Sequence, residues 1–531
     1  MKEFLLRHKK ILIVNLLIAA IAGIAKALAQ FLIRDITDGI AFNNFARVPV
    51  LVAFALGLHL ACIVLSLAGH WIQISLSRRF SAVTRVKLFN HVADAAQIEL
   101  ERLRTGDLQS AFRNDMDQAS GAVYLIAMFP HFILLLIFET IFLAAINLPL
   151  TVIVFASALV IGFITQNFLK VIKRYETASR KDLGDMSQSV LNIYESADTI
   201  KLNSAQSFVF RLFNVRRDSF NKNKLGSAKA DTFRLVLQIA LNNAALFGCV
   251  IYLSYQAING SATIGEVLAY ASLLAMLLAH IDNLFRRFAP LMSSIAAWER
   301  IKKLFDLQRE NSEMQSFGAT AFESINISEI NFGYSEDTPI FNGFSLHLKK
   351  GLTHALTGGS GSGKTTLIKI LLGFYDAPGM KIKKDGDASN DNLTGLIGYV
   401  PSDNRLFNMS IYDNIALGDE GITKEYCLEL AASIGFRGWI ESLPDGIDTM
   451  VVENAKNLSG GQAQSICILR ALATKRPMLI MDEPFAALDE HKEYALLETL
   501  EKVKKDRIVV VTSHRVSSID GCDEVIPIIG A

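Results

Sequence analysis

A glycine-rich segment next to a lysine and two threonines has the composition of a chemical site. It reads Gly358-Gly359-Ser360-Gly361-Ser362-Gly363-Lys364-Thr365-Thr366 and fits the pattern G-x-x-x-x-G-K-[ST]. An apolar strand pattern precedes it and an apolar helix pattern follows it. Glycines let backbone N–H groups close around phosphates, and a helix N-terminus adds positive potential. We therefore predict a nucleotide site in which Lys364 reaches the β- and γ-phosphates and Thr365 ligates Mg²⁺.

Two acidic residues end an apolar strand pattern further along the chain. The segment reads Met478-Leu479-Ile480-Met481-Asp482-Glu483. Such a pattern is common by itself, but with a phosphate-binding loop upstream it acquires a specific meaning. We expect Asp482 to hold Mg²⁺ and Glu483 to polarise the water that attacks the γ-phosphate of ATP.

A third motif lies between these two. It reads Leu458-Ser459-Gly460-Gly461-Gln462. A serine cap and bare glycine amides at a helix start suit an anionic phosphate. In this order, the three motifs resemble those of the ATP-binding cassette (ABC) transporters, in which LSGGQ is nearly diagnostic. The resemblance implies that this motif faces ATP bound to the opposite subunit, so that two ATPase domains form a sandwich dimer with composite sites.

The resemblance also assigns roles to three further residues. Tyr334, in Asn331-Phe332-Gly333-Tyr334, is similar to the aromatic residue that stacks on adenine. Asp489 matches the loop that crosses the dimer interface. His514, after an apolar strand pattern at 508–512, matches the histidine that contacts the γ-phosphate and Glu483. A core tyrosine or an ordinary surface histidine is the plain alternative for each ring.

One position departs from the family pattern. After the strand pattern that ends in Val400-Pro401, the family has a glutamine that contacts Mg²⁺ or the lytic water, but this chain has Ser402. Serine is shorter and would need a bridging water to reach the same place. Coupling could be altered, this chain could supply a weaker site to a heterodimer, or the change could have no consequence.

The composition indicates a chain that is partly membrane-embedded. It has 531 residues, of which 51% are hydrophobic, and a formal net charge of +1. That length exceeds one compact domain, and soluble proteins of this size are rarely so apolar. The balanced charge gives no argument for nucleic-acid binding. Five scattered cysteines indicate neither a disulfide framework nor a zinc site.

Six apolar segments have the length that a membrane-spanning helix needs. They run over approximately Ile11–Ile33, Val50–Ile74, Val123–Ile146, Leu150–Phe168, Leu235–Ile258 and Ile264–Leu284. The gaps after the second and fourth segments are long and rich in Lys and Arg, whereas the short gaps have almost none. Cationic loops stay in the cytoplasm, so both long gaps and both termini are expected inside. Helical spacing in the long gaps predicts that the helices continue into the cytoplasm.

The fold class follows from this division. We predict an all-α six-helix transmembrane domain, similar to the type I exporters, over 1–307 and a linker over 308–320. An α/β P-loop ABC ATPase domain is predicted over 321–531, because short β-rich patterns alternate with helices there. With about ten residues before the first span, we expect no peptidase or regulatory domain.

Two polar ladders could line a cargo cavity. Lys26 and Gln30 recur at helical spacing in the first span, and Gln238 and Asn242 do so in the fifth. Charges at membrane depth are costly and usually face a cavity or a partner. Glu139 in the third span is a possible counter-charge, with Gln73 and His280 as further candidates. For Arg34 and Arg234, which continue the ladders, water or lipid headgroups are the favoured surroundings.

These features together predict an ATP-driven exporter. It would use ATP and Mg²⁺ and work by alternating access as a homodimer in a bacterial inner membrane. Its cargo would be a peptide, a lipid or an amphipathic small molecule. The alternatives are one half of a heterodimer with a paralogous half-transporter, an importer of siderophores with the exporter fold, and an ATP-dependent sensor that transports nothing. The six spans exclude a soluble ATPase.

Overall fold

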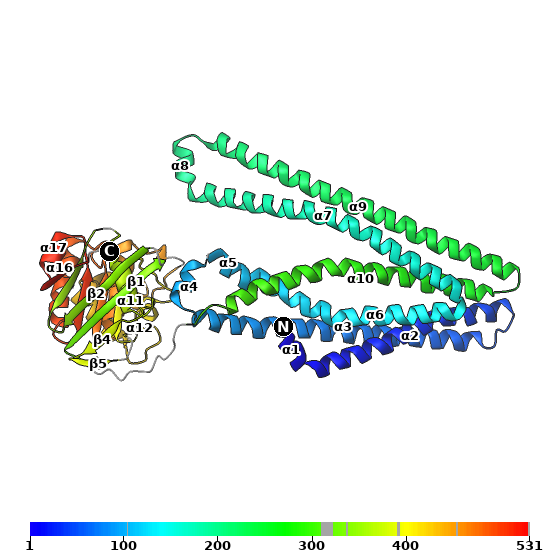
Figure 1. Cartoon of the computed structure of the whole chain (residues 1–531), viewed down its shortest axis with the longest axis horizontal. Coiled ribbons are helices and arrows are strands. Elements are labelled where there is room, and N and C mark those ends of the chain that lie inside the picture. Colours follow the sequence, from blue (N-terminus) through cyan, green and yellow to red (C-terminus); the bar gives the residue numbers. More distant parts are fainter. Residues whose placement is uncertain are drawn as a thin grey trace. The chain divides into compact units, whose positions relative to one another are not determined.

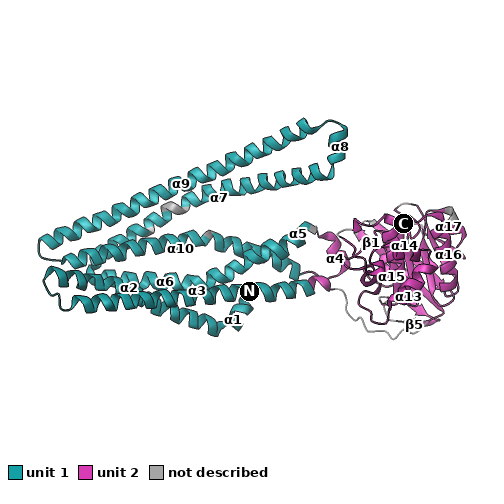
Figure 2. Ribbon diagram, turned by 180° about the vertical axis from the view of Figure 1, so that it is seen from behind, with its two compact units in different colours: residues 1–90, 105–306 teal, residues 91–104, 307–531 magenta. Residues whose placement is uncertain are grey.

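The chain forms two compact units in the computed structural model (Figures 1 and 2). Unit 1 contains residues 1–90 and 105–306, and unit 2 contains residues 91–104 and 307–531. The structure describes residues 1–103, 105–309, 322–335, 338–359, 361–389, 393, 395–452 and 455–528. The predicted linker over 308–320 therefore lies mostly outside the described residues.

Unit 1 is entirely helical. Its elements are α1 (Lys2–Arg7), α2 (Lys9–Ala41), α3 (Val48–Ala93), α5 (Thr105–Ser110), a π-helical turn (Ala111–Asp115), α6 (Met116–Ile146), α7 (Leu148–Glu195), α8 (Ala197–Leu202), α9 (Gln206–Ile258) and α10 (Ile264–Phe305). Six of the described helices are long and apolar enough to cross a membrane. They contain the six apolar segments of the sequence, so the expected six spans are confirmed.

Several of these helices are much longer than a bilayer requires. Helix α7 has 48 residues and α9 has 53. At 1.5 Å per residue they extend about 70–80 Å, whereas the hydrocarbon core measures about 30 Å. The excess lies in the cationic gaps of the sequence, as expected. Close packing joins the two helices, since a Cβ on Gly226 would lie 2.7 Å from the Tyr175 ring.

Five of the six described spans of unit 1 form two groups. Helices α2, α6 and α10 pack against one another, whereas α7 and α9 form a hairpin that diverges from them towards α8 (Figure 1). The groups meet in a buried apolar cluster around Leu143, Leu253, Tyr270 and Leu273. An N-terminal cap made by Thr263 and Glu266 begins α10. Asp38 of α2 strengthens this start, because it accepts hydrogen bonds from Thr263 Oγ1 at 2.7 Å and Gly265 N at 2.9 Å.

Unit 2 is an α/β domain, and this confirms the predicted fold class. Its strands are β1 (Ser324–Ser335), β2 (Thr338–Lys349), β3 (Thr353–Thr357), β4 (Lys381–Lys384), β5 (Asp387–Ser389), β6 (Ile397–Val400), β7 (Met478–Asp482), β8 (Ile508–Thr512) and β9 (Glu524–Pro527). Its helices are α4 (Gln97–Arg102), α11 (Lys364–Leu371), α12 (Ile411–Ala416), α13 (Lys424–Ser433), α14 (Arg437–Ser442), a 3₁₀ turn (Gly446–Asp448), α15 (Gly460–Ala473), α16 (Glu490–Val503) and α17 (Val516–Asp520).

Two sheets build this domain. One is antiparallel with the order β2-β1-β4-β5, and the other is parallel with the order β6-β7-β8-β3-β9. In a parallel sheet the carboxyl ends of all strands reach the same edge, where ligands bind. The loops after β3, β6, β7 and β8 therefore converge, and they carry most of the predicted ATP-site residues.

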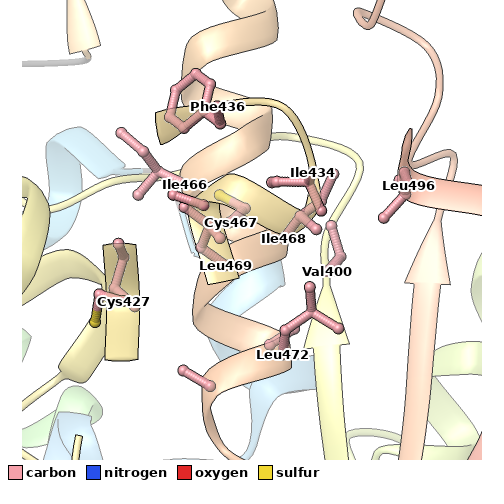
Figure 3. Close-up of a cluster of buried hydrophobic side chains, with 14 of the residues drawn as sticks. Val400, Cys427, Ile434, Phe436, Ile466, Cys467, Ile468, Leu469, Leu472 and Leu496 are labelled. Carbon is pink, nitrogen blue, oxygen red and sulfur yellow. The ribbon is translucent and has the colours of Figure 1, made fainter. Parts of the chain in front are cut away.

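Helix α15, which begins with the Leu458–Gln462 motif (the signature motif), is buried in one core cluster of unit 2. Ile466, Cys467, Ile468 and Leu469 are fully buried, and Phe436 of the neighbouring segment packs with them (Figure 3). Burial on nearly all sides holds the helix rigidly. The glycines at its N-terminus therefore have a fixed position relative to β7.

Residues 91–104, part of the first long cationic gap of the sequence, belong to unit 2. Helix α4 packs with the ATPase domain, where Ile98 joins a core cluster. Ala96 N donates to Gln308 O at 2.9 Å. The predicted domain boundary at residue 307 placed this segment in the membrane domain. A local sequence pattern does not reveal which distant segment it contacts.

Candidate functional site

The phosphate-binding loop has the backbone shape that its glycines predict. It joins β3 to α11, and Gly358, Gly361 and Gly363 have φ values of 157°, 83° and 97°. A Cβ on Gly358 would lie 2.5 Å from Ser362 Oγ and 2.7 Å from Ile528 O. These positions accept glycine because larger residues would be strained or would collide. Ser360 lies outside the described residues.

The ammonium group of Lys364 sits within this loop. Its Nζ donates to Gly358 O at 2.7 Å and to Gly359 O at 3.0 Å. Lys364 and Thr366, at the start of α11, are both buried. A cation and a row of amide donors in one concave segment form a site for phosphate.

Hydroxyl and carboxylate oxygens meet beside the loop. Thr365 Oγ1 lies 3.4 Å from Asp482 Oδ2, and Asp482 is 3% exposed at the end of β7. Hard oxygen donors of this kind are what Mg²⁺ prefers. The two residues that the sequence predicted as magnesium ligands are thus brought together, and they fit the ion.

Thr512 is a residue of the site that the sequence analysis missed. It is fully buried and lies opposite Asp482 in the parallel pairing of β7 and β8. Its Oγ1 donates to Asp482 Oδ1 at 2.7 Å and accepts from Glu483 N at 2.8 Å. Thr512 therefore fixes both acidic residues. The end of an apolar strand next to His514 was the only signal in the sequence.

Glu483 and His514 face each other across the edge of the sheet. Glu483 Oε1 lies 3.4 Å from His514 Nε2, and both side chains are partly exposed. Glu483 has a φ of 52°, a conformation that is uncommon outside glycine and that clusters at functional sites. The pair that the sequence predicted for catalysis is therefore assembled within one chain.

The signature motif begins α15 with a reciprocal cap. Ser459 Oγ accepts from Gln462 N at 3.3 Å, and Ser459 N donates to Gln462 Oε1 at 2.7 Å. A Cβ on Gly461 would lie 2.5 Å from Ala487 O. Glycine is therefore required where the signature motif approaches the loop after β7, and Gly460 beside it is exposed.

Gln464 is a second residue that the sequence analysis missed. It is 1% exposed, donates to Glu483 O at 2.8 Å and accepts from Ala487 N at 3.0 Å. One side chain thus ties α15 to the end of β7 and to the loop that follows it. A glutamine one turn into a helix carries no distinctive signal in a sequence.

Asp489 has a local structural role that can be seen directly. It caps α16, since its Oδ1 accepts from Lys492 N at 2.9 Å and its Oδ2 lies 2.9 Å from Lys492 Nζ. The backbone hydrogen bond, and then the lysine side chain, lower the pKa of Asp489 from its ordinary value. The contact across a dimer that was predicted for Asp489 stays a prediction.

The predicted adenine platform is linked to helix α4. Tyr334 is 55% exposed, and its hydroxyl lies 3.2 Å from Thr366 Oγ1. Its ring is edge-on to Tyr375, which stacks on Phe332 at 5.1 Å. Tyr375 in turn donates to Glu101 Oε2 at 2.6 Å. The aromatic cluster thus runs from the exposed Tyr334 to helix α4 within unit 2.

Glu101 is held as an anion by its neighbours. Lys369 Nζ donates to Glu101 Oε1 at 2.9 Å. Burial alone would raise the pKa of Glu101, but hydrogen bonds from Tyr375 and Lys369 outweigh it and lower that pKa. Burial, and then the Glu101 carboxylate, raise the pKa of Tyr375. The contact is therefore a charge-assisted one, the stronger class of hydrogen bond.

Ser402 lies in the loop after β6, the strand that pairs with β7. Val400 lies opposite Met481 in that pairing, so Ser402 follows at the same edge of the sheet as Asp482. Its side chain is exposed. The position matches the family's glutamine, and its catalytic role stays a prediction.

Three predicted polar residues of unit 1 form a buried chain. Lys26 Nζ lies 3.1 Å from His280 Nε2, and His280 Nδ1 lies 2.9 Å from Glu139 Oε2. Glu139 is 1% exposed. An ammonium only donates and a carboxylate only accepts, so His280 donates through Nδ1 and accepts through Nε2. Two of the three N–H groups of Lys26 remain for other partners.

Lys26 also lines a cavity of about 530 Å³ between α2, α3, α6 and α10. Gln73, His131 and Arg287 line it as well. Arg287 Nε is buried and has no hydrogen-bond partner within the described part of the chain. Apolar walls complete the cavity, among them Phe132, whose ring lies 5.4 Å from the Arg287 guanidinium. The cavity therefore combines cationic and apolar surface.

The other predicted cavity residues lie elsewhere. Gln30 is half-buried and does not line this cavity. Gln238 and Asn242 line a separate narrow crevice. The expectation that water or lipid headgroups surround Arg234 is wrong, because this side chain is only 6% exposed. Its guanidinium lies 2.8 Å from Asp231 Oδ1 and donates to Gln238 Oε1 at 2.9 Å. Local ion pairing, rather than solvent, compensates this charge.

Two family models match the chain. The model described as "ABC transporter transmembrane region" matches residues 12–281, and that described as "ABC transporter" matches residues 341–486. The first covers half of the chain, and the second contains the phosphate-binding loop and the signature motif. Together they coincide with the helical unit and with the nucleotide site described above.

Curated relatives share the full arrangement. An "ATP-dependent lipid A-core flippase" of Chromobacterium violaceum is 26% identical over 98% of this chain and 91% of its own length. The protein of that name from Vibrio cholerae is 28% identical over 98% and 90%. An "ABC transporter B family member 1" of Dictyostelium discoideum is 27% identical over 92% of this chain and 54% of its own length.

A solved structure shares the fold. It is described as "Structure of a bacterial Atm1-family ABC exporter with ATP bound" and superposes with a TM-score of 0.80. The match covers 97% of this chain and 93% of the other at 21% identity. Both units of the present fold thus recur in that chain.

Proposed function

This chain belongs to the ABC transporters, and from that premise we propose that it exports a lipid-type amphiphile with an anionic headgroup as a homodimer. The family and the comparisons support ATP-driven export by a multi-pass membrane protein with its own ATPase domain. The single observation behind the cargo class is the cavity, in which Lys26 and Arg287 lie among apolar walls. The lipid named in the relatives' titles agrees with it.

In this proposal, the residues of unit 2 hydrolyse ATP without a covalent intermediate. Lys364 and the loop amides bind the phosphates, Glu483 orients the attacking water, and His514 contacts the γ-phosphate. Thr365 and Asp482 would hold Mg²⁺, which neutralises phosphate charge when bound. Thr512 and Gln464 keep Glu483 in its strained backbone conformation. Closure of two such domains would drive alternating access.

The hairpin of α7 and α9 supports a dimer. Its far end and the adjoining α8 expose large apolar side chains, among them Leu202 at 84%, Phe208 at 61% and Phe210 at 64%. These residues lie in a cationic gap that the charge pattern places in the cytoplasm, so lipid does not cover them. Exposed apolar patches of this kind mark interaction surfaces. A second copy of the chain is the partner that a half-transporter needs.

The cargo site combines chemistry that suits both parts of an amphiphile. Lys26 keeps two N–H donors, and Arg287 keeps at least one, for a phosphate or carboxylate. Glu139, through His280, balances one of these charges and holds Lys26 in place. The surrounding Leu135 and Phe132 offer apolar surface for an acyl chain.

The test measures ATP hydrolysis and lipid movement by the purified chain in lipid. We expect turnover that Glu483→Gln abolishes, and stimulation by phosphorylated amphiphiles that exceeds stimulation by neutral ones. Lys26→Met should weaken this stimulation and leave basal turnover intact, while Lys10→Met, an exposed lysine outside the cavity, serves as the control. Equal stimulation of wild type and Lys26→Met would contradict the cargo assignment.

Ser402 motivates a second candidate, in which this chain forms half of a heterodimer. Serine is shorter than the family's glutamine and would need a bridging water to reach the site. Turnover by the chain alone would favour the homodimer. Turnover that appears only with Ser402→Gln, or only with a second chain, would favour the heterodimer.

A further inference from the structure

We propose that a groove between α1, α2 and α6 binds one anionic phospholipid of the surrounding membrane. This site goes beyond the cargo cavity and does not depend on what is exported. The groove has a volume of about 690 Å³, a size that holds small ligands. Lys2 and Lys9 lie on its rim, and Trp298 of α10 contributes to its wall.

The groove lies where the helical conformation is interrupted between α1 and α2. Helix α1 ends at Arg7, and α2 begins at Lys9 after His8 leaves the helical conformation. Phe4 anchors α1, because its ring packs edge-on against Phe80 at 5.2 Å, and Phe80 packs on Trp298 at 5.4 Å. The short helix α1 is thereby held near α3 and α10, and residues of α1, α2 and α6 line the groove. Figure 1 shows where α1 meets α2.

The floor of the groove is apolar and includes Pro130 of α6. Pro130 interrupts the hydrogen bonding of α6, and the nearby Ala127 O accepts from Asn15 Nδ2 at 2.8 Å. Leu5, Leu12 and Leu16 contribute hydrocarbon surface. The leucine side chains offer a surface for an acyl chain.

The rim carries unpaired positive charge. Lys2 and Lys9 are exposed, and neither has an ion pair within the described residues, whereas Arg7 is paired with Glu3 at 2.9 Å. Lysines at the cytoplasmic end of a first span lie at the level of lipid phosphates. An apolar slot below two free ammonium groups matches the shape of a lipid with a negative headgroup.

The groove is separate from the proposed cargo cavity. Asn15 lies between them, since it lines both and its side chain is bound to α6. The cargo cavity is lined with cationic and histidine side chains at membrane depth, whereas the charge of the groove lies only at its rim. The difference indicates a resident lipid whose headgroup stays at the membrane surface.

The experiment uses the full-length chain after removal of lipid. Phosphatidylglycerol or phosphatidylcholine with identical acyl chains is added back, and native mass spectrometry counts the lipids retained while a melting curve reports stabilisation. We expect preferential retention of phosphatidylglycerol. The pair Lys2→Gln and Lys9→Gln should lower its apparent affinity by about 5-fold per lysine. Lys10→Gln, which removes the same charge away from the groove, should leave it unchanged.

A second pair of variants tests the slot itself. Leu16→Trp fills the wall of the groove, and Leu17→Trp adds the same ring to an exposed position outside it. Only Leu16→Trp should remove the retained lipid. Equal retention of both lipids, an equal effect of Lys10→Gln, or an equal effect of Leu17→Trp would overturn the proposal. Loss of cargo-stimulated turnover in Leu16→Trp with lipid retention intact would also overturn it and would assign the groove to cargo.

Discussion

Thr512 offers a stringent test of how the catalytic edge is held together. Thr512 is fully buried, its hydroxyl donates to Asp482 at 2.7 Å, and it accepts from the partly buried Glu483 N at 2.8 Å. Thr512→Val keeps the shape and removes both bonds. A buried N–H without a partner costs about 1–3 kcal/mol, and a hydrogen bond to a charged group is worth about 1.5–3 kcal/mol. We therefore expect the substitution to remove about 3 kcal/mol of the interaction free energy that holds Asp482 and Glu483 in place.

The loss should appear mainly in turnover. Because Thr512 fixes Glu483 and Asp482 but does not itself contact the phosphate loop, kcat for ATP hydrolysis should fall about 100-fold while KM changes little. Thr512→Ser retains the hydroxyl and is the matched control, with turnover near that of wild type. Steady-state kinetics and melting curves of the full chain in lipid measure both effects. If Thr512→Val keeps more than half of wild-type kcat, or if Thr512→Ser is equally impaired, the reasoning is refuted.

Three further predictions follow from contacts within single units. A double-mutant cycle of Glu101→Gln and Tyr375→Phe, measured by thermal melting, should give a coupling free energy of about 1 kcal/mol, and zero coupling would contradict the contact. Because folding lowers the pKa of Glu101, this stabilisation is present above the ordinary pKa of the carboxyl group. It is lost as pH falls through the lowered value. Gly265→Ala places a Cβ against the Arg34 carbonyl and should destabilise by about 2 kcal/mol, whereas Gly248→Ala, with open space around it, should not. Gly461→Ala should lower ATPase turnover at least about 10-fold, because its Cβ would lie 2.5 Å from Ala487 O; unchanged kcat would show that the loop after β7 is free to move.

The motifs of the ATP site could be predicted from the sequence because each is a continuous segment. The phosphate loop, the acidic pair and the signature motif carry their chemistry in adjacent residues, and the strand patterns before them predict a common edge. The six spans could likewise be predicted from length and apolar composition. In both cases the information is local.

Residues that act through register or docking could not be found in this way. Thr512 belongs to the site because β8 pairs with β7 in one particular register. Gln464 belongs to it because α15 lies beneath the loop after β7. Glu101 reaches Tyr375 across 274 positions of the chain. Such contacts are decided by tertiary packing, which no local spacing encodes.

The polar ladder of the first span shows the limit of helical periodicity. Lys26 and Gln30 lie one turn apart, yet only Lys26 lines the cavity, because neighbouring helices cover successive turns of a face differently. The prediction of Glu139 as its counter-charge was close, since His280 joins the two. Lys26 and His280 are 254 residues apart in the sequence, so no local pattern predicts their contact.

Lys26, His280 and Glu139 form a hydrogen-bonded triad whose structural role can be separated by experiment from the cargo role proposed for Lys26. A carboxylate that is 1% exposed at membrane depth is costly when it stands alone. His280 and Lys26 offset this cost, so removing either leaves a buried group without its partner, whereas replacing all three by apolar residues could keep the packing of α2, α6 and α10. If the three side chains have only a structural role, the triple replacement should leave the stimulation of ATP hydrolysis by cargo unchanged. If Lys26 binds an anionic headgroup, the triple replacement should abolish that stimulation, because it removes the charge that faces the cavity.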